Sequence, residues 1–155
     1  MDEALEFIQK LNATDSKYNY RLPTEAEWEY SVRAGPDPWH DTIYSHGNNP
    51  RELGAYAWYY ANSGKQTHDV ASLKPNANGL YDMHGNVWEW TQDRWISDDM
   101  RFAVEPTEPS FEMHRVLRGG SIEDSQYSLS SSSFMFLQQS DRRYHTGFRL
   151  VRTPQ

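Results

Sequence analysis

The chain contains no cysteine among its 155 residues. This absence excludes disulfides, metal sites built from thiolates and catalysis by a cysteine nucleophile. It also removes any sign of an oxidising compartment. Stability must therefore come from a packed core, and a chain of this length can form one in a single domain.

Net positive charge and long apolar runs are missing as well. The formal net charge is −7, so binding to a nucleic-acid backbone is not expected. No apolar run reaches the length of a membrane span, and the N-terminus lacks the pattern of a signal peptide, so the chain as written is expected in the cytoplasm. The mean hydropathy is only −0.91, yet aromatic residues make up 14% of the chain, which favours an aromatic core over disorder.

Periodicity and turn residues predict one α+β domain over residues 1–155. Two helices are predicted near the N-terminus, over 2–12 and over 24–35, where Thr24 and Glu27 form a capping box and Gly35 ends the helix. Short strands are predicted at 18–22, 87–91, 115–117 and 147–152. Residues 36–78 and 97–112 show little periodicity and are predicted to be long loops.

The most specific run is residues 79–91, which read GLYDMHGNVWEWT. Gly85-Asn86 is predicted to be a tight turn that takes positive φ, and a strand follows it. Glu89 stands among large aromatic side chains, where a carboxylate needs a partner because an unpaired buried charge is costly. Trp88 and Trp90 are predicted to belong to the core rather than to a ligand platform.

Three further blocks are equally distinctive, namely YRLPTEAEWEY at 20–30, RVLRGGS at 115–121 and GFRL at 147–150. In this order the four blocks resemble the signature of the formylglycine-generating-enzyme (sulfatase-modifying factor) family. The resemblance implies a C-type-lectin-like α+β fold with two N-terminal helices, a small twisted antiparallel sheet and long loops. The part that usually precedes the first helix in this family is absent, so we expect a single family domain without it.

Catalytic members of that family bind copper through two cysteines, and the resemblance places these positions on Asp124 and Leu129. Neither side chain is a thiolate, the ligand that holds Cu(I), so we expect no copper and no oxygenase activity. Ser121 matches the family's active-site serine but has no adjacent base. None of the histidines shows metal-site spacing, and His84 is predicted to be a turn residue.

A non-catalytic branch of the family, the variable proteins of diversity-generating retroelements, uses the domain only for binding. Its diversified positions lie between the RGGS and GFR blocks, and here that segment, 122–145, departs from the family pattern. The resemblance implies a bacterial or phage domain that binds a protein or surface ligand, with a phage or cell surface as the alternative location. The predicted ligand-binding residues are Ile122, Asp124, Ser125, Tyr127, Ser133, Phe134, Phe136, Tyr144 and His145.

Two other functions remain open. One is an enzyme of the formylglycine-generating or sulfoxide-synthase-like superfamily that uses a different metal or a partner domain. The other is a structural or regulatory module of a larger assembly. The binding function is preferred because the chain has no cysteine and no histidine cluster.

The serine-rich stretch before FMFL at 134–137 has two interpretations. It is either a turn into a core strand, in which alternation buries half of the apolar side chains, or a ligand-facing surface of aromatic residues among small serines. The second interpretation is favoured. In both, Phe134 and Phe136 share one face, whereas Phe148 is assigned to the scaffold core.

The turn before the 87–91 strand also offers the oxygen ligands that calcium prefers. The family resemblance implies a calcium site there, formed by Asn86, Val87 and Glu89. The alternative is a structural turn in which Glu89 pairs with Arg118 or Arg149.

Overall fold

The computed structural model of the chain describes residues 1–33, 42–95 and 114–155. The predicted helix end at Gly35 and the predicted loop at 97–112 lie outside the described residues. No helix in the described part of the chain is long and apolar enough to cross a membrane.

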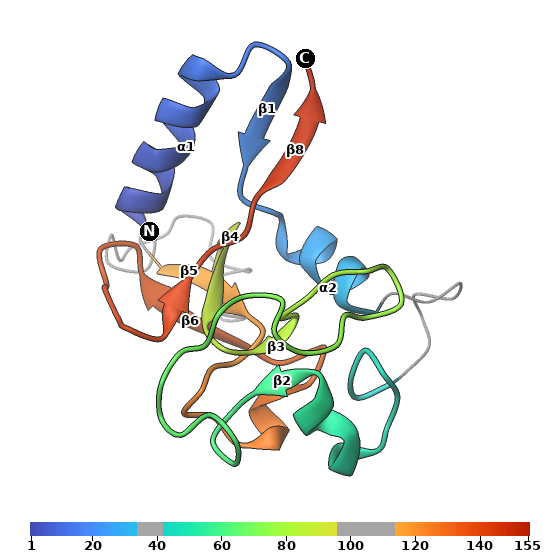
Figure 1. Cartoon of the computed structure of the whole chain (residues 1–155). Coiled ribbons are helices and arrows are strands. Elements are labelled where there is room, and N and C mark those ends of the chain that lie inside the picture. Colours follow the sequence, from blue (N-terminus) through green and yellow to red (C-terminus); the bar gives the residue numbers. More distant parts are fainter. Residues whose placement is uncertain (34–41, 96–113) are drawn as a thin grey trace, which may run out of the picture.

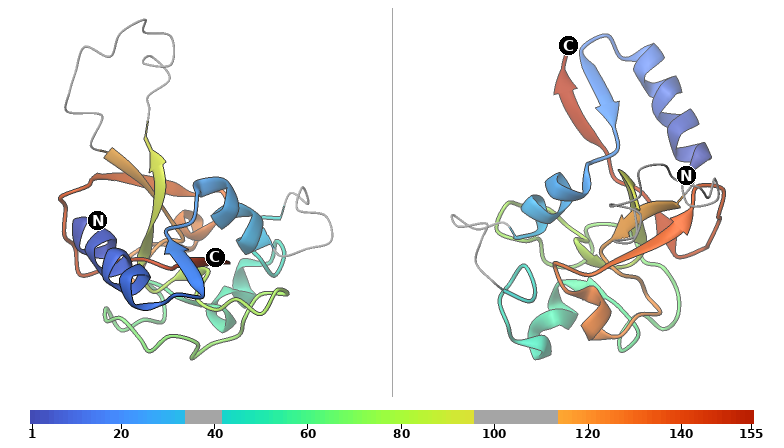
Figure 2. Two further views of the ribbon diagram at one scale, coloured as in Figure 1. Left: turned by 90° about the horizontal axis from the view of Figure 1, so that it is seen from above. Right: turned by 180° about the vertical axis from the view of Figure 1, so that it is seen from behind.

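The N-terminal helix and the two ends of the chain form one side of the molecule. Helix α1 (Asp2–Thr14) is followed by strand β1 (Tyr18–Arg21), which pairs antiparallel with the last strand, β8 (Val151–Pro154). Figures 1 and 2 show this helix and strand pair standing together, with the C-terminus at the far tip. The helix buries Ala4 and Ile8, which share a face at a spacing of four residues.

Helix α2 (Glu25–Arg33) begins with the predicted capping box. The Oγ of Thr24 accepts a hydrogen bond from the Glu27 N–H at 3.1 Å, and the Glu27 carboxylate accepts one from the Thr24 N–H at 2.9 Å. Arg21 donates two further bonds to Glu27, and these contacts hold the pKa of its carboxyl down to about 2. The second helix therefore starts where the sequence predicts.

A four-stranded sheet with the order β6-β5-β4-β7 forms the centre of the molecule. Its strands are β4 (Trp88–Arg94), β5 (His114–Arg118), β6 (Phe134–Gln138) and β7 (Thr146–Gly147). Strands β4, β5 and β6 pair antiparallel as predicted, but β7 pairs parallel with β4. The predicted strand at 147–152 is in fact two short strands, β7 and β8, that belong to different sheets.

The opposite side of the molecule consists mainly of turns. It contains the 3₁₀ helix η1 (Pro50–Ala55), a short parallel pair of β2 (Ala57–Trp58) and β3 (His84–Gly85), and the 3₁₀ helix η3 (Gln126–Leu129). Residues 59–78 form turns with no helix or strand, which confirms this part of the predicted loop.

The main core lies between α1 and the central sheet and confirms the prediction for Trp88 and Trp90. Its buried members are Ile8, Leu22, Trp88, Trp90, Leu117 and Leu137. Alternation along β6 buries Leu137 and exposes both Phe134 and Phe136, so these two residues do share a face. Phe148, in contrast, is 38% exposed and its ring lies 5.8 Å from the tilted ring of Phe7 in α1, so its assignment to the buried scaffold is wrong.

Candidate functional site

An ion pair joins the buried Glu89 of the central strand β4 to the half-buried Arg149. Both Glu89 carboxylate oxygens accept bonds from Arg149 at 2.7 Å, and Oε2 also accepts one from the Trp28 indole N–H at 2.7 Å. Burial alone lowers the pKa of the Arg149 guanidinium, but the charge and hydrogen bonds of Glu89 outweigh this effect and raise the pKa. Glu89 therefore has the partner that its aromatic surroundings require.

The turn before this strand has the predicted geometry. Gly85 and Asn86 have φ of 75° and 61°, and a Cβ on Gly85 would lie 2.1 Å from the carbonyl oxygen of Trp58. The Asn86 side chain accepts from the backbone N–H of His68 and donates to its carbonyl.

These contacts bear on the calcium prediction. The side-chain oxygens of Asn86 and Glu89 are both engaged within the fold, and Glu89 pairs with Arg149 as in the alternative interpretation. The residues as arranged do not fit the ion, because Arg149 would have to leave Glu89 first. Calcium binding by Asn86, Val87 and Glu89 stays a prediction.

Arg118 is a second buried charge, with 1% of the residue exposed. Its guanidinium donates to the carbonyl oxygens of residues 131–133 at 2.7–3.0 Å and forms ion pairs with Glu29 and Glu25. Burial lowers the pKa of the Arg118 guanidinium, and the two glutamates oppose that shift. Arg118 thus binds the middle of the predicted ligand segment, residues 131–133, through its backbone.

His84 performs a similar task and is not the turn residue that was predicted. It lies in β3 with 1% exposure, and its Nδ1 donates to the Leu129 carbonyl at 2.7 Å. Its Nε2 accepts the backbone N–H of Ser45 at 3.0 Å. Because burial opposes the charged form, the pKa of His84 falls to about 4. A neutral His84 therefore fixes the end of η3.

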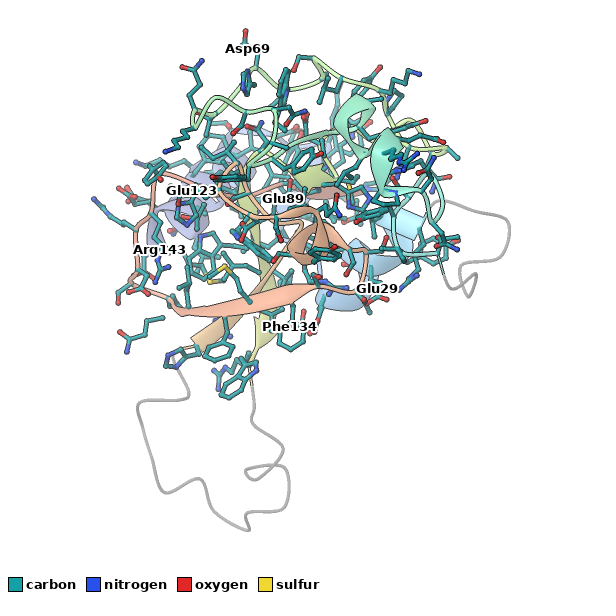
Figure 3. The ribbon with its side chains drawn as sticks, turned by 90° about the horizontal axis from the view of Figure 1, so that it is seen from below. Glu29, Asp69, Glu89, Glu123, Phe134 and Arg143 are labelled. Atoms are coloured by element: carbon teal, nitrogen blue, oxygen red, sulfur yellow. The ribbon has the colours of Figure 1, made fainter. Side chains whose placement is uncertain are left out.

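Above these contacts lies an open hollow of about 770 Å³. We call it the 121–145 hollow, because that segment supplies all of its lining residues except Trp88. The lining residues are Trp88, Ser121, Glu123, Asp124, Tyr127, Ser128, Ser132, Ser133, Phe134, Met135, Arg143 and His145. Figure 3 shows Glu123 and Arg143 on the same side of the ribbon, away from Glu29. The structure therefore brings together five of the predicted residues, namely Asp124, Tyr127, Ser133, Phe134 and His145.

Four predicted ligand residues lie elsewhere. Ile122 is fully buried, with its N–H bonded to the Asn86 carbonyl and its own carbonyl bonded to Ser63, so its assignment to a ligand surface is wrong. Ser125 is exposed but outside the hollow. The remaining two do not line the hollow: Phe136 stacks on Trp95 at 4.1 Å, and Tyr144 lines a neighbouring hollow against α1.

Sequence reasoning missed Glu123, Arg143 and Trp88 as lining residues. Glu123 accepts a hydrogen bond from the Tyr144 hydroxyl, which raises the pKa of that phenol, and lies 3.4 Å from Nδ1 of His145. The sequence did contain a signal for two of them, because Glu123 is adjacent to the predicted residue Asp124 and Arg143 is adjacent to the predicted residue Tyr144. Trp88 was correctly assigned to the core, but its indole N–H reaches Asp124 at the base of the hollow.

Comparison with known proteins identifies the family to which this fold belongs. A family model described as the sulfatase-modifying factor enzyme 1-like domain matches residues 1–154. The chain belongs to this family. Within it, the formylglycine-generating enzyme of Mus musculus is 37% identical over 110 residues, which cover 65% of this chain and 30% of the enzyme.

Two solved structures agree with the α+β, C-type-lectin-like fold. Variable protein 1 of Treponema denticola has a TM-score of 0.71 and 38% identity, and the match covers 87% of this chain and 48% of that chain. PvdO from Pseudomonas aeruginosa has a TM-score of 0.71 and 30% identity over 95% of this chain and 57% of that chain. The chain thus spans 30–57% of the lengths of these relatives.

The positions that the family resemblance assigns to copper do not fit that metal. Leu129 is fully buried and has no ligating atom, and its side chain packs within 2.8 Å of where a Cβ on Gly120 would lie. Asp124 offers hard oxygen rather than sulfur, and its Oδ2 accepts bonds from Trp88 and Ser121. Among the described residues, no group of three or more His, Asp or Glu side chains could hold a metal ion.

Proposed function

We propose that this chain is a non-enzymatic ligand-binding domain whose 121–145 hollow contacts a protein or surface ligand. The supporting observation is that the scaffold binds this segment through its backbone while its aromatic side chains face outward. Tyr127 is 79% exposed and Phe134 is 53% exposed, and both line the hollow between serines. Tyrosine and serine together provide contact area and adaptable hydrogen bonding, as in antibody binding sites.

The likeness to variable protein 1 adds support, because that structure shares the fold and 38% of aligned residues. Exposed aromatic side chains clustered in a concave site are also typical of interfaces rather than of inert surface.

A random-peptide library displayed on phage tests the proposal. Peptides are selected on the wild-type chain and then measured against Ser132→Trp, which fills the hollow from an exposed lining position. Ser125→Trp is the matched control, because Ser125 is an exposed serine of the same segment outside the hollow.

We expect selected peptides to lose at least about tenfold in affinity for the Ser132 variant and to bind the Ser125 variant normally. Peptides that bind both variants as tightly as the wild type would refute a ligand site in the hollow.

The enzymatic alternative rests on family membership alone. Because neither Asp124 nor Leu129 can supply a thiolate, we expect no formylglycine when the chain is incubated with copper, oxygen and a cysteine-containing sulfatase peptide. The peptide mass reports the reaction directly, with a copper-only blank as the control. Conversion above that blank would show that the chain is an enzyme.

A further inference from the structure

We infer that the 121–145 hollow accepts a basic side chain, arginine or lysine, projecting from a protein partner; this inference rests on the proposed function. Glu123 and Asp124 both line the hollow, and they are the acidic lining residues within the described part of the chain. Arg143 is the lining residue of opposite charge. The inference depends on how the carboxylates, the aromatic walls and this one cation are arranged.

Asp124 is a preoriented acceptor at the base of the hollow. Its Oδ2 accepts bonds from the Trp88 indole N–H at 2.8 Å, the Ser121 N–H at 2.9 Å and the Ser121 hydroxyl at 2.5 Å. All three bonds end on one oxygen, so the carboxylate cannot rotate away, and among the described residues no donor is bonded to Oδ1. A fixed carboxylate with a spare oxygen suits a guanidinium or ammonium donor.

Aromatic side chains complete the site. Tyr127 and Phe134 line the same hollow and expose most of their surface. A cation over an aromatic face is attracted by the ring quadrupole, and the alkyl stem of lysine or arginine packs on such a surface. The combination of fixed carboxylate and aromatic wall therefore matches a long basic side chain better than an acidic or purely apolar one.

Arg143 does not cancel this preference. Its nearest acidic group is Asp141 at 4.0 Å, and its side chain is 46% exposed, so it stands at the solvent side of the hollow. Glu123 is 49% exposed and adds a second negative charge to the hollow, where its carboxylate lies against Tyr144 and His145. The net charge of −7 over the whole chain also steers a basic partner toward the protein.

Capped tripeptides with one variable central residue test the inference directly. Arginine, lysine, glutamine and glutamate versions are titrated while NMR follows the Trp88 indole N–H, which bonds to Asp124 and is identified with Trp88→Phe. We expect shifts with the arginine and lysine peptides in the millimolar range, and binding weaker by about tenfold or more for glutamine.

Charge-removing variants of the lining residues should change the affinity for a cationic ligand and for an anionic ligand in opposite directions. Glu123→Gln should weaken the arginine peptide several-fold and Arg143→Gln should strengthen it, since the first removes an attractive charge and the second a repulsive one. Asp69→Asn is the control, because Asp69 is an exposed acid at the opposite end of the molecule from Phe134 (Figure 3). Tighter binding of the glutamate peptide, or no Trp88 shift with any basic peptide, overturns the inference.

The displayed peptides separate this inference from the proposed function. Each arginine or lysine of a hollow-dependent peptide is replaced by glutamine, and at least one replacement should cost about tenfold in affinity. Peptides that need the hollow but tolerate every such replacement would refute the basic ligand and leave the binding function standing. If no selected peptide needs the hollow, the proposed function itself fails.

Discussion

The buried centre and the 121–145 hollow are built in opposite ways. In the centre, side chains bind side chains: Glu89 pairs with Arg149 and Trp28, and each charge depends on a particular partner. Around the hollow, scaffold side chains bind backbone: Arg118 and His84 donate to carbonyl oxygens of the segment. Since every residue type has a carbonyl, the hollow keeps its shape when its exposed side chains change.

This difference separates positions that must be conserved for folding from positions that are free to vary. The distinction does not follow the segment boundaries, because Ile122, Leu129 and Ser131 lie within the segment and are fully buried. The free positions are those where the backbone is held and the side chain is exposed, such as Tyr127 and Phe134. Four predictions test the comparison.

Arg118→Met should have the largest effect. It removes the donors of three backbone carbonyl groups as well as the ion pair of the buried Arg118 with Glu29, and we expect a loss of about 4–5 kcal/mol in unfolding free energy. Chemical denaturation measures the loss. Arg142→Met is the control, because Arg142 also pairs with a glutamate but is 74% exposed, and it should cost less than about 0.5 kcal/mol. Equal losses in the two variants would show that the backbone contacts of Arg118 do not matter.

Glu89→Gln should come next, at about 3–4 kcal/mol, because it removes the buried carboxylate and leaves the half-buried Arg149 without its counter-charge. The same variant sharpens the calcium question. Thermal melts of the wild type with calcium and with chelator should coincide if the ion pair is the whole role of Glu89. If calcium raises the melting temperature of the wild type but not that of Glu89→Gln, the predicted site at Asn86, Val87 and Glu89 would be established.

Acid should weaken the contact between His84 and Ser45, because a proton on Nε2 removes the lone pair that accepts the Ser45 N–H. The folded-state pKa of His84 is depressed from 6.5 to about 4, so the unfolded chain takes up the proton first as the pH falls. The contribution to stability is therefore complete above pH 6.5 and decreases by up to about 3 kcal/mol as the pH falls to 4. Denaturation at several pH values measures this slope. In His84→Gln the slope between these pH values should shrink, and an unchanged slope would assign it to other groups.

Local signals in the sequence predicted the local structure. Two of these predictions depend only on neighbouring residues, namely the capping box at Thr24 and Glu27 and the positive φ of Gly85 and Asn86. The third, a partner for Glu89, follows from the cost of burying an unpaired charge. Tertiary packing decided the rest. Phe148 resembled core by its sequence block, yet its place beside α1 leaves it partly exposed.

The candidate site was predictable only in part for the same reason. Composition identified the segment, but which side of the chain faces the hollow depends on contacts far apart in sequence. Ile122 turns inward because its backbone is bonded to Asn86 and Ser63. His84 is buried where its Nδ1 donates to the carbonyl of Leu129, a residue 45 positions further along the chain. No sequence periodicity carries that information.

The smallest effect on stability, and the most direct test, comes from changing the hollow as a whole. One chain carries Tyr127→Ser, Ser132→Tyr, Phe134→Ser and Arg143→Ser, four exposed lining positions whose backbone contacts remain. Chemical denaturation and affinity for the selected peptides are measured on the same sample. The account predicts an unfolding free energy within about 1 kcal/mol of the wild type, together with loss of peptide binding. An unfolded protein, or a folded one that binds the peptides as before, would contradict it.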